Sequence, residues 1–269
     1  MSFITLPGAG SFCYALSRMP KNTAKSVEAL VAEIRDYCRS HADPANAGRY
    51  ARYFREGYDA WGLLDKNHPV WTAGKQDWLD RYRHLGLAGF LKAGILLFES
   101  GKFEETSLAI QFVEALRGEF DEGSFGKLGR WFEAGIANWA HTDALCALVI
   151  SPLLESGRIP LAALGGWRES THEYQRRAVP VAMLGLLKTA TKVAVLLDFL
   201  RPLMLDSERV VHQGLGWFLR EAWKRYPKEV EEFLLEWKDQ AARLIFQYAT
   251  EKMSAAGRAR FRAAKRRPS

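Results

Sequence analysis

An indole, an imidazole and a carboxylate lie within five residues of one another in the stretch "NWAHTDALCALVISPLL". Trp139 and Asp143 are four positions apart, so a helix that includes both places them on one face. A fixed carboxylate stabilises positive charge, and indole faces attract cations. The same residues also fit an ordinary helix start, with Thr142 as the N-cap and Asp143 in the first turn. The spacing alone does not decide between a functional site and a helix cap.

Two adjacent arginines, Arg176 and Arg177, stand directly before the buried run "AVPVAML". Positive charge near the start of a helix is disfavoured by the helix dipole. This mismatch indicates that one of the two side chains faces an external anion. The alternative is a surface ion pair with Glu169 or Glu173.

The stretch "HQGLGWFLREAW" places Gly214 and Gly216 inside a helical pattern. Each glycine costs roughly 1 kcal/mol relative to alanine there, and close approach of a backbone or a ligand is one way to recover it. By composition alone, Trp217 fits the core, and Arg220 and Glu221 fit an internal ion pair.

Helical periodicity runs through almost the whole chain. The segment "SVEALVAEIRDYC" places its apolar residues on one stripe, and "ALCALVIS" and "VAVLLDFL" are apolar nearly all round. Short breaks with Pro or Gly separate the segments, and no hairpin pattern occurs. Many helix pairs in series without heptads predict an all-α, HEAT-like helical-repeat solenoid of antiparallel helix pairs.

We expect three parts: a loosely ordered N-terminal arm over 1–25, a single helical-repeat domain over 26–254, and a basic C-terminal tail over 255–269. The start of the chain has no basic region ahead of an apolar core, so it does not resemble a signal peptide.

The net charge of +7 indicates a polyanionic partner, either nucleic acid or an acidic membrane. The alternative is that the excess of basic residues serves solubility alone. Cys13, Cys38 and Cys146 lack metal-binding spacing and fit a reducing cytoplasm. No run reaches the roughly 18 apolar residues of a membrane span. These features predict a cytoplasmic protein without a metal and without membrane attachment.

Taken in order, "WAHTD", "RRAVPVAML" and "GWFLRE" resemble the helical-repeat DNA glycosylases of the AlkD type. That family carries a Trp-x-x-x-Asp element, an Arg-led helix and a "GW-x-LRE" helix. The intervals, 34 residues from Asp143 to Arg177 and 40 from Arg177 to Trp217, are also similar. The stretch "YARYFREGYDAWGLLDKNHPVW" is similar to a family segment near the N-terminus, and the resemblance covers roughly residues 46 to 250.

The resemblance implies roles for four residues. Trp139 and Trp217 would flank a damaged nucleotide, Asp143 would lie at the deoxyribose, and Arg177 would hold the DNA backbone. Asp143, Trp139 and Trp217 are therefore the candidate catalytic residues.

Arg176 and His141 join Arg177 as candidate DNA contacts. For His141, a hydrogen bond to a nearby loop carbonyl is the alternative. Ala140 stands where the family often has a second acid after the first Trp. This departure changes the local electrostatics, and with them the expected substrate range.

Purines alkylated at N3 or N7 are cationic and leave as neutral bases, so their release needs no protonation. Positive charge develops on the sugar, where a carboxylate such as Asp143 can stabilise it and orient water. The resemblance thus implies a monofunctional alkylpurine DNA glycosylase without cofactor or metal. Its substrates would be 3-methyladenine and 7-methylguanine in duplex DNA, bound on a concave basic face.

We expect this enzyme to be monomeric and to associate with the nucleoid. Two alternatives are a non-catalytic DNA-binding helical-repeat scaffold and a protein-binding helical repeat. Asp143 argues against the first, because a scaffold has no use for a carboxylate near phosphates. The net charge of +7 argues against the second.

Overall fold

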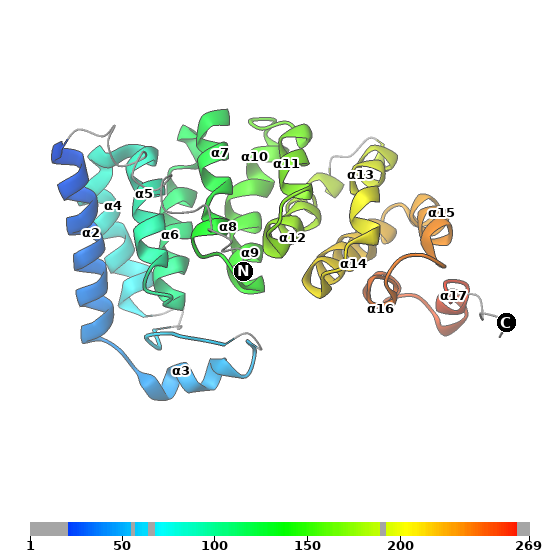
Figure 1. The fold of residues 1–269 in the computed structure, drawn as a ribbon, viewed down its shortest axis with the longest axis horizontal. Coiled ribbons are helices and arrows are strands. Elements are labelled where there is room, and N and C mark those ends of the chain that lie inside the picture. The colour runs from blue at the N-terminus through cyan, green and yellow to red at the C-terminus, as the bar shows by residue number, and fades with distance from the viewer. Residues whose placement is uncertain (1–20, 55–56, 64–67, 189–191, 263–269) are drawn as a thin grey trace, which may run out of the picture. The chain divides into compact units, whose positions relative to one another are not determined.

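The computed structural model describes residues 21–54, 57–63, 68–188 and 192–262. Within these ranges the regular structure is helical and contains no strand (Figure 1), which confirms the predicted all-α class. The chain divides into two compact units, Met1–Phe112 and Val113–Ser269. The solenoid path, its concave basic face and the domain boundaries stay predictions.

The helices of the first unit begin with α2, and the last of them, α6, runs into the second unit. They are α2 (Lys21–Ser40), α3 (Pro44–Ala51), η1 (Val70–Gly74), α4 (Lys75–Tyr82), η2 (Arg83–Leu85), α5 (Gly86–Phe98) and α6 (Phe103–Ala115). The label η marks a short π-helix, as in η1, or a short 3-10 helix, as in η2. The apolar stripe predicted in α2 is buried, with no exposed surface on Val27, Leu30 and Ile34, and α2 packs against α5.

Two fully buried carboxylates in the first turn of α6 hold the segment over residues 57–63. Glu104 accepts hydrogen bonds from the backbone N–H groups of Trp61, Gly62 and Leu63 at 2.8–2.9 Å. Glu105 accepts from the Trp61 indole at 3.0 Å and from Arg35 Nε at 3.1 Å. Because each carboxylate oxygen has a donor, their burial is compensated.

The second unit continues with α-helices of 4 to 15 residues and, between some of them, single turns of 3-10 or π helix. They are η3 (Arg117–Glu119), α7 (Glu122–Gly129), α8 (Trp131–Ala134), α9 (Trp139–Leu145), η4 (Cys146–Ile150), α10 (Ser151–Glu155), η5 (Leu161–Leu164), α11 (Gly165–Arg168), α12 (Glu173–Ala182), η6 (Gly185–Lys188), α13 (Val193–Leu200), η7 (Arg201–Leu205), α14 (Arg209–Trp223), α15 (Pro227–Trp237), α16 (Arg243–Ala249) and α17 (Ala255–Ala259).

The helix that carries the opening motif begins at Trp139, earlier than a Thr142 cap would place it. Asn138 is the N-cap, and its side-chain oxygen accepts from the backbone N–H of His141 at 2.9 Å. Thr142 is buried inside α9. The interpretation of Thr142 as the cap is therefore wrong, and Trp139 and Asp143 lie in the same helix.

Four helices of the second unit pack in succession: α9 against α12, α12 against α14, and α14 against α16. The two glycines of α14 permit the last two contacts. A Cβ on Gly214 would meet Arg177 Cγ at 3.1 Å, and a Cβ on Gly216 would meet Tyr248 Cβ at 2.5 Å. The close approach expected from the "GLGW" pattern is confirmed at both positions.

The first residues of the predicted C-terminal tail are folded. Ser254 caps α17, Phe261 is 1% exposed, and Arg243 donates to the Phe261 carbonyl at 2.8 Å. Residues 263–269, like residues 1–20 of the predicted N-terminal arm, lie outside the described residues. In the part of the chain that is described, no helix has the length and apolar character to cross a membrane.

Candidate functional site

A cleft of about 310 Å³ opens among α9, α12, α14 and α16 of the second unit. Its lining combines indoles, cations and neutral polar groups: Trp139, Arg177, Gln213, Trp217, Arg220 and Tyr248. Trp139 is 41% exposed, and Trp217 is half-buried on the cleft wall. The composition-based interpretation of Trp217 as a core residue is therefore wrong. Trp139, Arg177 and Trp217, which the resemblance assigns to one site, therefore line the same cleft.

Asp143 lies one helical turn after Trp139 and forms a two-pronged ion pair with Arg177. Arg177 Nε donates to Oδ1 at 3.0 Å, and Nη2 donates to Oδ2 at 2.9 Å. Arg177 Nη1 donates to the Val210 carbonyl at 2.9 Å. The Asp143–Arg177 pair thus connects α9, α12 and α14. Arg177 lines the cleft, whereas Asp143 is not among the lining residues.

The pair is largely shielded from water, with 18% of the Asp143 side chain and 7% of the Arg177 side chain exposed. Burial raises the pKa of Asp143, and the hydrogen bonds from Arg177 oppose that rise. In such surroundings a carboxylate acts on nearby charge more strongly than it does in bulk water.

Arg177 has a second task that the sequence did not reveal. It was expected to hold a DNA backbone, but three of its five N–H groups are used by Asp143 and Val210. Its side chain still lines the cleft, so a DNA contact by the remaining donors stays a prediction. Orienting Asp143 is the role that the hydrogen bonds support directly.

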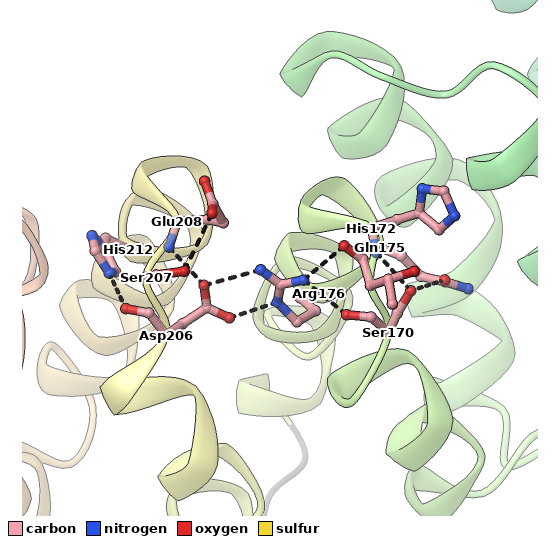
Figure 2. Close-up of polar contacts among 9 residues, drawn as sticks. Ser170, His172, Gln175, Arg176, Asp206, Ser207, Glu208 and His212 are labelled. Atoms are coloured by element: carbon pink, nitrogen blue, oxygen red, sulfur yellow. Dashed lines mark hydrogen bonds and ion pairs between the residues drawn. The ribbon is translucent and has the colours of Figure 1, made fainter. Parts of the chain in front are cut away.

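Arg176 faces inward, which does not fit the prediction that it contacts DNA. Figure 2 shows its guanidinium between Asp206 and the loop before α12. Nε and Nη2 donate to the Asp206 carboxylate at 2.6 and 3.2 Å, and Nη1 donates to the carbonyls of Ser170 and Thr171 at 2.8 and 3.2 Å. Only 15% of the Arg176 side chain and 6% of the Asp206 side chain are exposed. Its partner is therefore neither Glu169 nor Glu173.

The Arg176–Asp206 ion pair belongs to a wider polar network that fixes the start of α12 to the start of α14 (Figure 2). Asp206 Oδ1 accepts from the Glu208 backbone N–H at 2.8 Å, and the Asp206 carbonyl lies 2.6 Å from His212 Nε2. Because a carbonyl can only accept, this nitrogen of His212 carries the hydrogen. The network therefore holds the two helices that supply Arg177 and Trp217.

His141 is 3% exposed and lies two positions after Trp139 in α9. Its Nδ1 lies 2.8 Å from Asn138 Nδ2, and its backbone N–H donates to Asn138 Oδ1. This position does not fit the prediction that His141 contacts DNA. The local hydrogen bond that was the alternative is present, although its partner is a side-chain amide.

Gln213, Arg220 and Tyr248 line the cleft but were not assigned to it from the sequence. Gln213 and Arg220 lie four positions before and three positions after Trp217, so all three share one face of α14. This spacing could have identified them. Tyr248 comes from α16 and had no local signal.

Arg220 also forms the ion pair predicted with Glu221. Its Nε donates to Glu221 Oε1 at 3.1 Å, and its Nη1 donates to Glu251 Oε2 at 2.5 Å. The cleft therefore presents a second guanidinium, which forms ion pairs with two partly exposed acids that do not line the cleft.

Residues 34–253 match the family of DNA alkylation repair enzymes, and the chain belongs to this family, as the resemblance to the AlkD type predicted. Among solved structures, it is similar to a predicted DNA alkylation repair enzyme from Enterococcus faecalis, with a TM-score of 0.64 and 15% sequence identity. That alignment covers 80% of this chain and 98% of the other. At this identity the likeness concerns the fold. The search of curated proteins found no match.

Proposed function

We propose that this member of the family is a monofunctional DNA glycosylase. It hydrolyses the N-glycosidic bond of cationic alkylpurines, such as 3-methyladenine and 7-methylguanine, in duplex DNA, and it acts as a monomer. The observation that supports this most directly is that Trp139, Trp217 and Arg177 line one cleft and that Arg177 holds the Asp143 carboxylate through two hydrogen bonds.

The arrangement suits a reaction in which positive charge moves from base to sugar. Indole faces attract a cation by about 0.5–2 kcal/mol each, and Trp139 and Trp217 both border the cleft. Arg177 fixes the Asp143 carboxylate, so no reorganisation is needed as the sugar becomes positive. The alkylated base leaves neutral, and therefore the cleft needs no acid to protonate it.

The cationic part of the lining is suited to the DNA strand. Arg177 and Arg220 both border the cleft, and guanidinium groups bind phosphate oxygens with charge-assisted hydrogen bonds. Such contacts position a strand without reading its sequence, as repair of scattered lesions requires.

One observation favours the alternative of a non-catalytic DNA-binding scaffold. Asp143 is bound by Arg177 through both oxygens, and a neutralised pair of this kind would suffice to join the helices of a scaffold that has no catalytic role. Asp143→Asn separates the two functions, because asparagine has nearly the same shape and no charge.

The test is release of 7-methylguanine and 3-methyladenine from methylated duplex DNA, with DNA retention measured in parallel. We expect wild type to release both, and Asp143→Asn to retain DNA but release almost nothing. Asp198→Asn is the matched control, because Asp198 is 65% exposed and pairs with Arg201 on α13 and η7, away from the cleft. DNA retention by wild type without base release would favour the scaffold.

A further inference from the structure

One wall of the cleft has no part in the mechanism above. Gln213 of α14 and Tyr248 of α16 form this wall, and Gln213 Nε2 donates to the Tyr248 hydroxyl oxygen at 2.9 Å. Both side chains are half-buried. They are therefore held in place at the surface that a ligand would meet.

The backbone of α14 is shaped to admit Tyr248. A Cβ on Gly216 would lie 2.5 Å from Tyr248 Cβ and 2.8 Å from the Ile245 carbonyl oxygen. Any larger residue at 216 would push α16, and Tyr248 with it, away from α14. Because Gly216 directly precedes Trp217, the same turn of α14 supplies the indole and sets the distance to the tyrosine.

The hydrogen bond from Gln213 decides how the tyrosine hydroxyl can be used. A phenol hydroxyl accepts and donates, and here it accepts from Gln213. Among the residues that the structure describes, no acceptor takes the hydrogen of the Tyr248 hydroxyl. Tyr248 thus presents an oriented O–H donor on the cleft wall.

The surroundings select the class of ligand group. Arg220 lies seven positions after Gln213, on the same face of α14, and lines the same cleft. A neutral O–H donor in the same cleft as a guanidinium suits an anionic oxygen that takes several donors, and in DNA this group is the phosphate.

We propose that Tyr248 donates its hydroxyl hydrogen to a non-bridging phosphate oxygen of the nucleotide held between Trp139 and Trp217, and that Gln213 orients this hydroxyl. The identity of the nucleotide rests on the proposed function. Tyr248 is thereby a substrate-binding residue, and Gln213 is a positioning residue.

The test measures binding to a duplex with one tetrahydrofuran abasic site, in which each nearby phosphate is replaced in turn by a neutral methylphosphonate. Wild type is compared with Tyr248→Phe, which removes only the hydroxyl. Tyr226→Phe is the control, because Tyr226 lies outside the cleft and points its hydroxyl toward the Leu187 carbonyl. Thermal unfolding of each variant checks that the fold is retained.

Tyr248→Phe should raise Kd about tenfold, as expected for loss of a hydrogen bond to a charged group. This factor should fall toward one when the methylphosphonate occupies the contacted position, and should persist at the others. Tyrosine is neutral, so the slope of log Kd against log salt should not change in Tyr248→Phe, whereas Arg220→Gln should lower it by about one.

A tenfold factor that is the same at every methylphosphonate position would overturn the proposal and assign Tyr248 to the sugar or base. Equal Kd values for wild type and Tyr248→Phe would overturn it as well. The binding assay does not depend on base release. If the wild-type protein binds the abasic duplex but releases no base, the proposed function is refuted, while the Kd values still test the contact of Tyr248 with phosphate. Absence of DNA binding by wild type contradicts both.

Discussion

Replacement of Gly216 by alanine tests whether the packing of α14 against α16 sets the cleft. The added Cβ would lie 2.5 Å from Tyr248 Cβ and 2.8 Å from the Ile245 carbonyl oxygen. Carbon atoms in contact prefer about 3.5–4.0 Å, so the two helices must separate by roughly 1 Å. The obstructing atoms are a Cβ and a backbone oxygen, which cannot rotate away as the end of a long side chain can.

The expected cost follows from two opposing effects. Overpacking of a core costs about 1–3 kcal/mol and sometimes more, and the rigid obstruction at Gly216 places this site at the upper end. Alanine recovers about 1 kcal/mol of helix propensity. We therefore expect Gly216→Ala to lower the free energy of unfolding by about 2 kcal/mol, and Tm by roughly 4–8 °C.

Gly126→Ala is the matched control, since Gly126 is an exposed residue within α7 and a Cβ there would meet nothing within 4 Å. It should raise the free energy of unfolding by about 0.5–1 kcal/mol. Urea unfolding measures both variants, and abasic-duplex Kd should rise only for Gly216→Ala. Equal stabilisation by the two substitutions would refute the packing argument.

Two further predictions concern the arginine pairs. Arg176→Ala leaves the buried Asp206 carboxylate without its cation and should lower the free energy of unfolding by about 3–5 kcal/mol. Arg201→Ala, which breaks two more exposed pairs with Asp198 and Glu236, should cost at most about 1 kcal/mol per pair. Equal losses in urea unfolding would contradict the role given to Arg176. Burial raises the pKa of Asp143, so its carboxyl is protonated at a higher pH than that of an exposed aspartate. Single-turnover base release by wild type should therefore decline as pH falls through that raised pKa, and an acid limb that persisted in the residual rate of Asp143→Asn would assign the titration to another group.

Local patterns in the sequence predicted the features that depend on neighbouring residues. The spacing of Trp139 and Asp143 placed both on one helical face, and the glycines of "GLGW" marked two close helix contacts. The order of three motifs identified the family. In each case the signal lies within a few turns of one helix or in the succession of helices.

Two residues were misassigned or missed because the partner lies far along the chain, and the helix cap was misplaced for a local reason. Arg176 was expected to face an anion outside the protein, because Asp206, 30 residues later, could not be recognised as its partner. Tyr248 was missed because it reaches the cleft only through the packing of α16 on α14. The cap of α9 was misplaced because Asn138 and Thr142 are both suitable capping residues, and only the backbone shows which one begins the helix.

The central claim is that the charge of Asp143 drives base release, and the ratio of single-turnover rates for Asp143→Asn and wild type on 7-methylguanine duplex DNA tests it most directly. Removal of one fixed electrostatic contact at a transition state typically lowers the rate by about 10²–10³. We predict a loss of this size, with the Kd for the abasic duplex within about threefold of wild type. A rate for Asp143→Asn close to that of wild type would contradict the account.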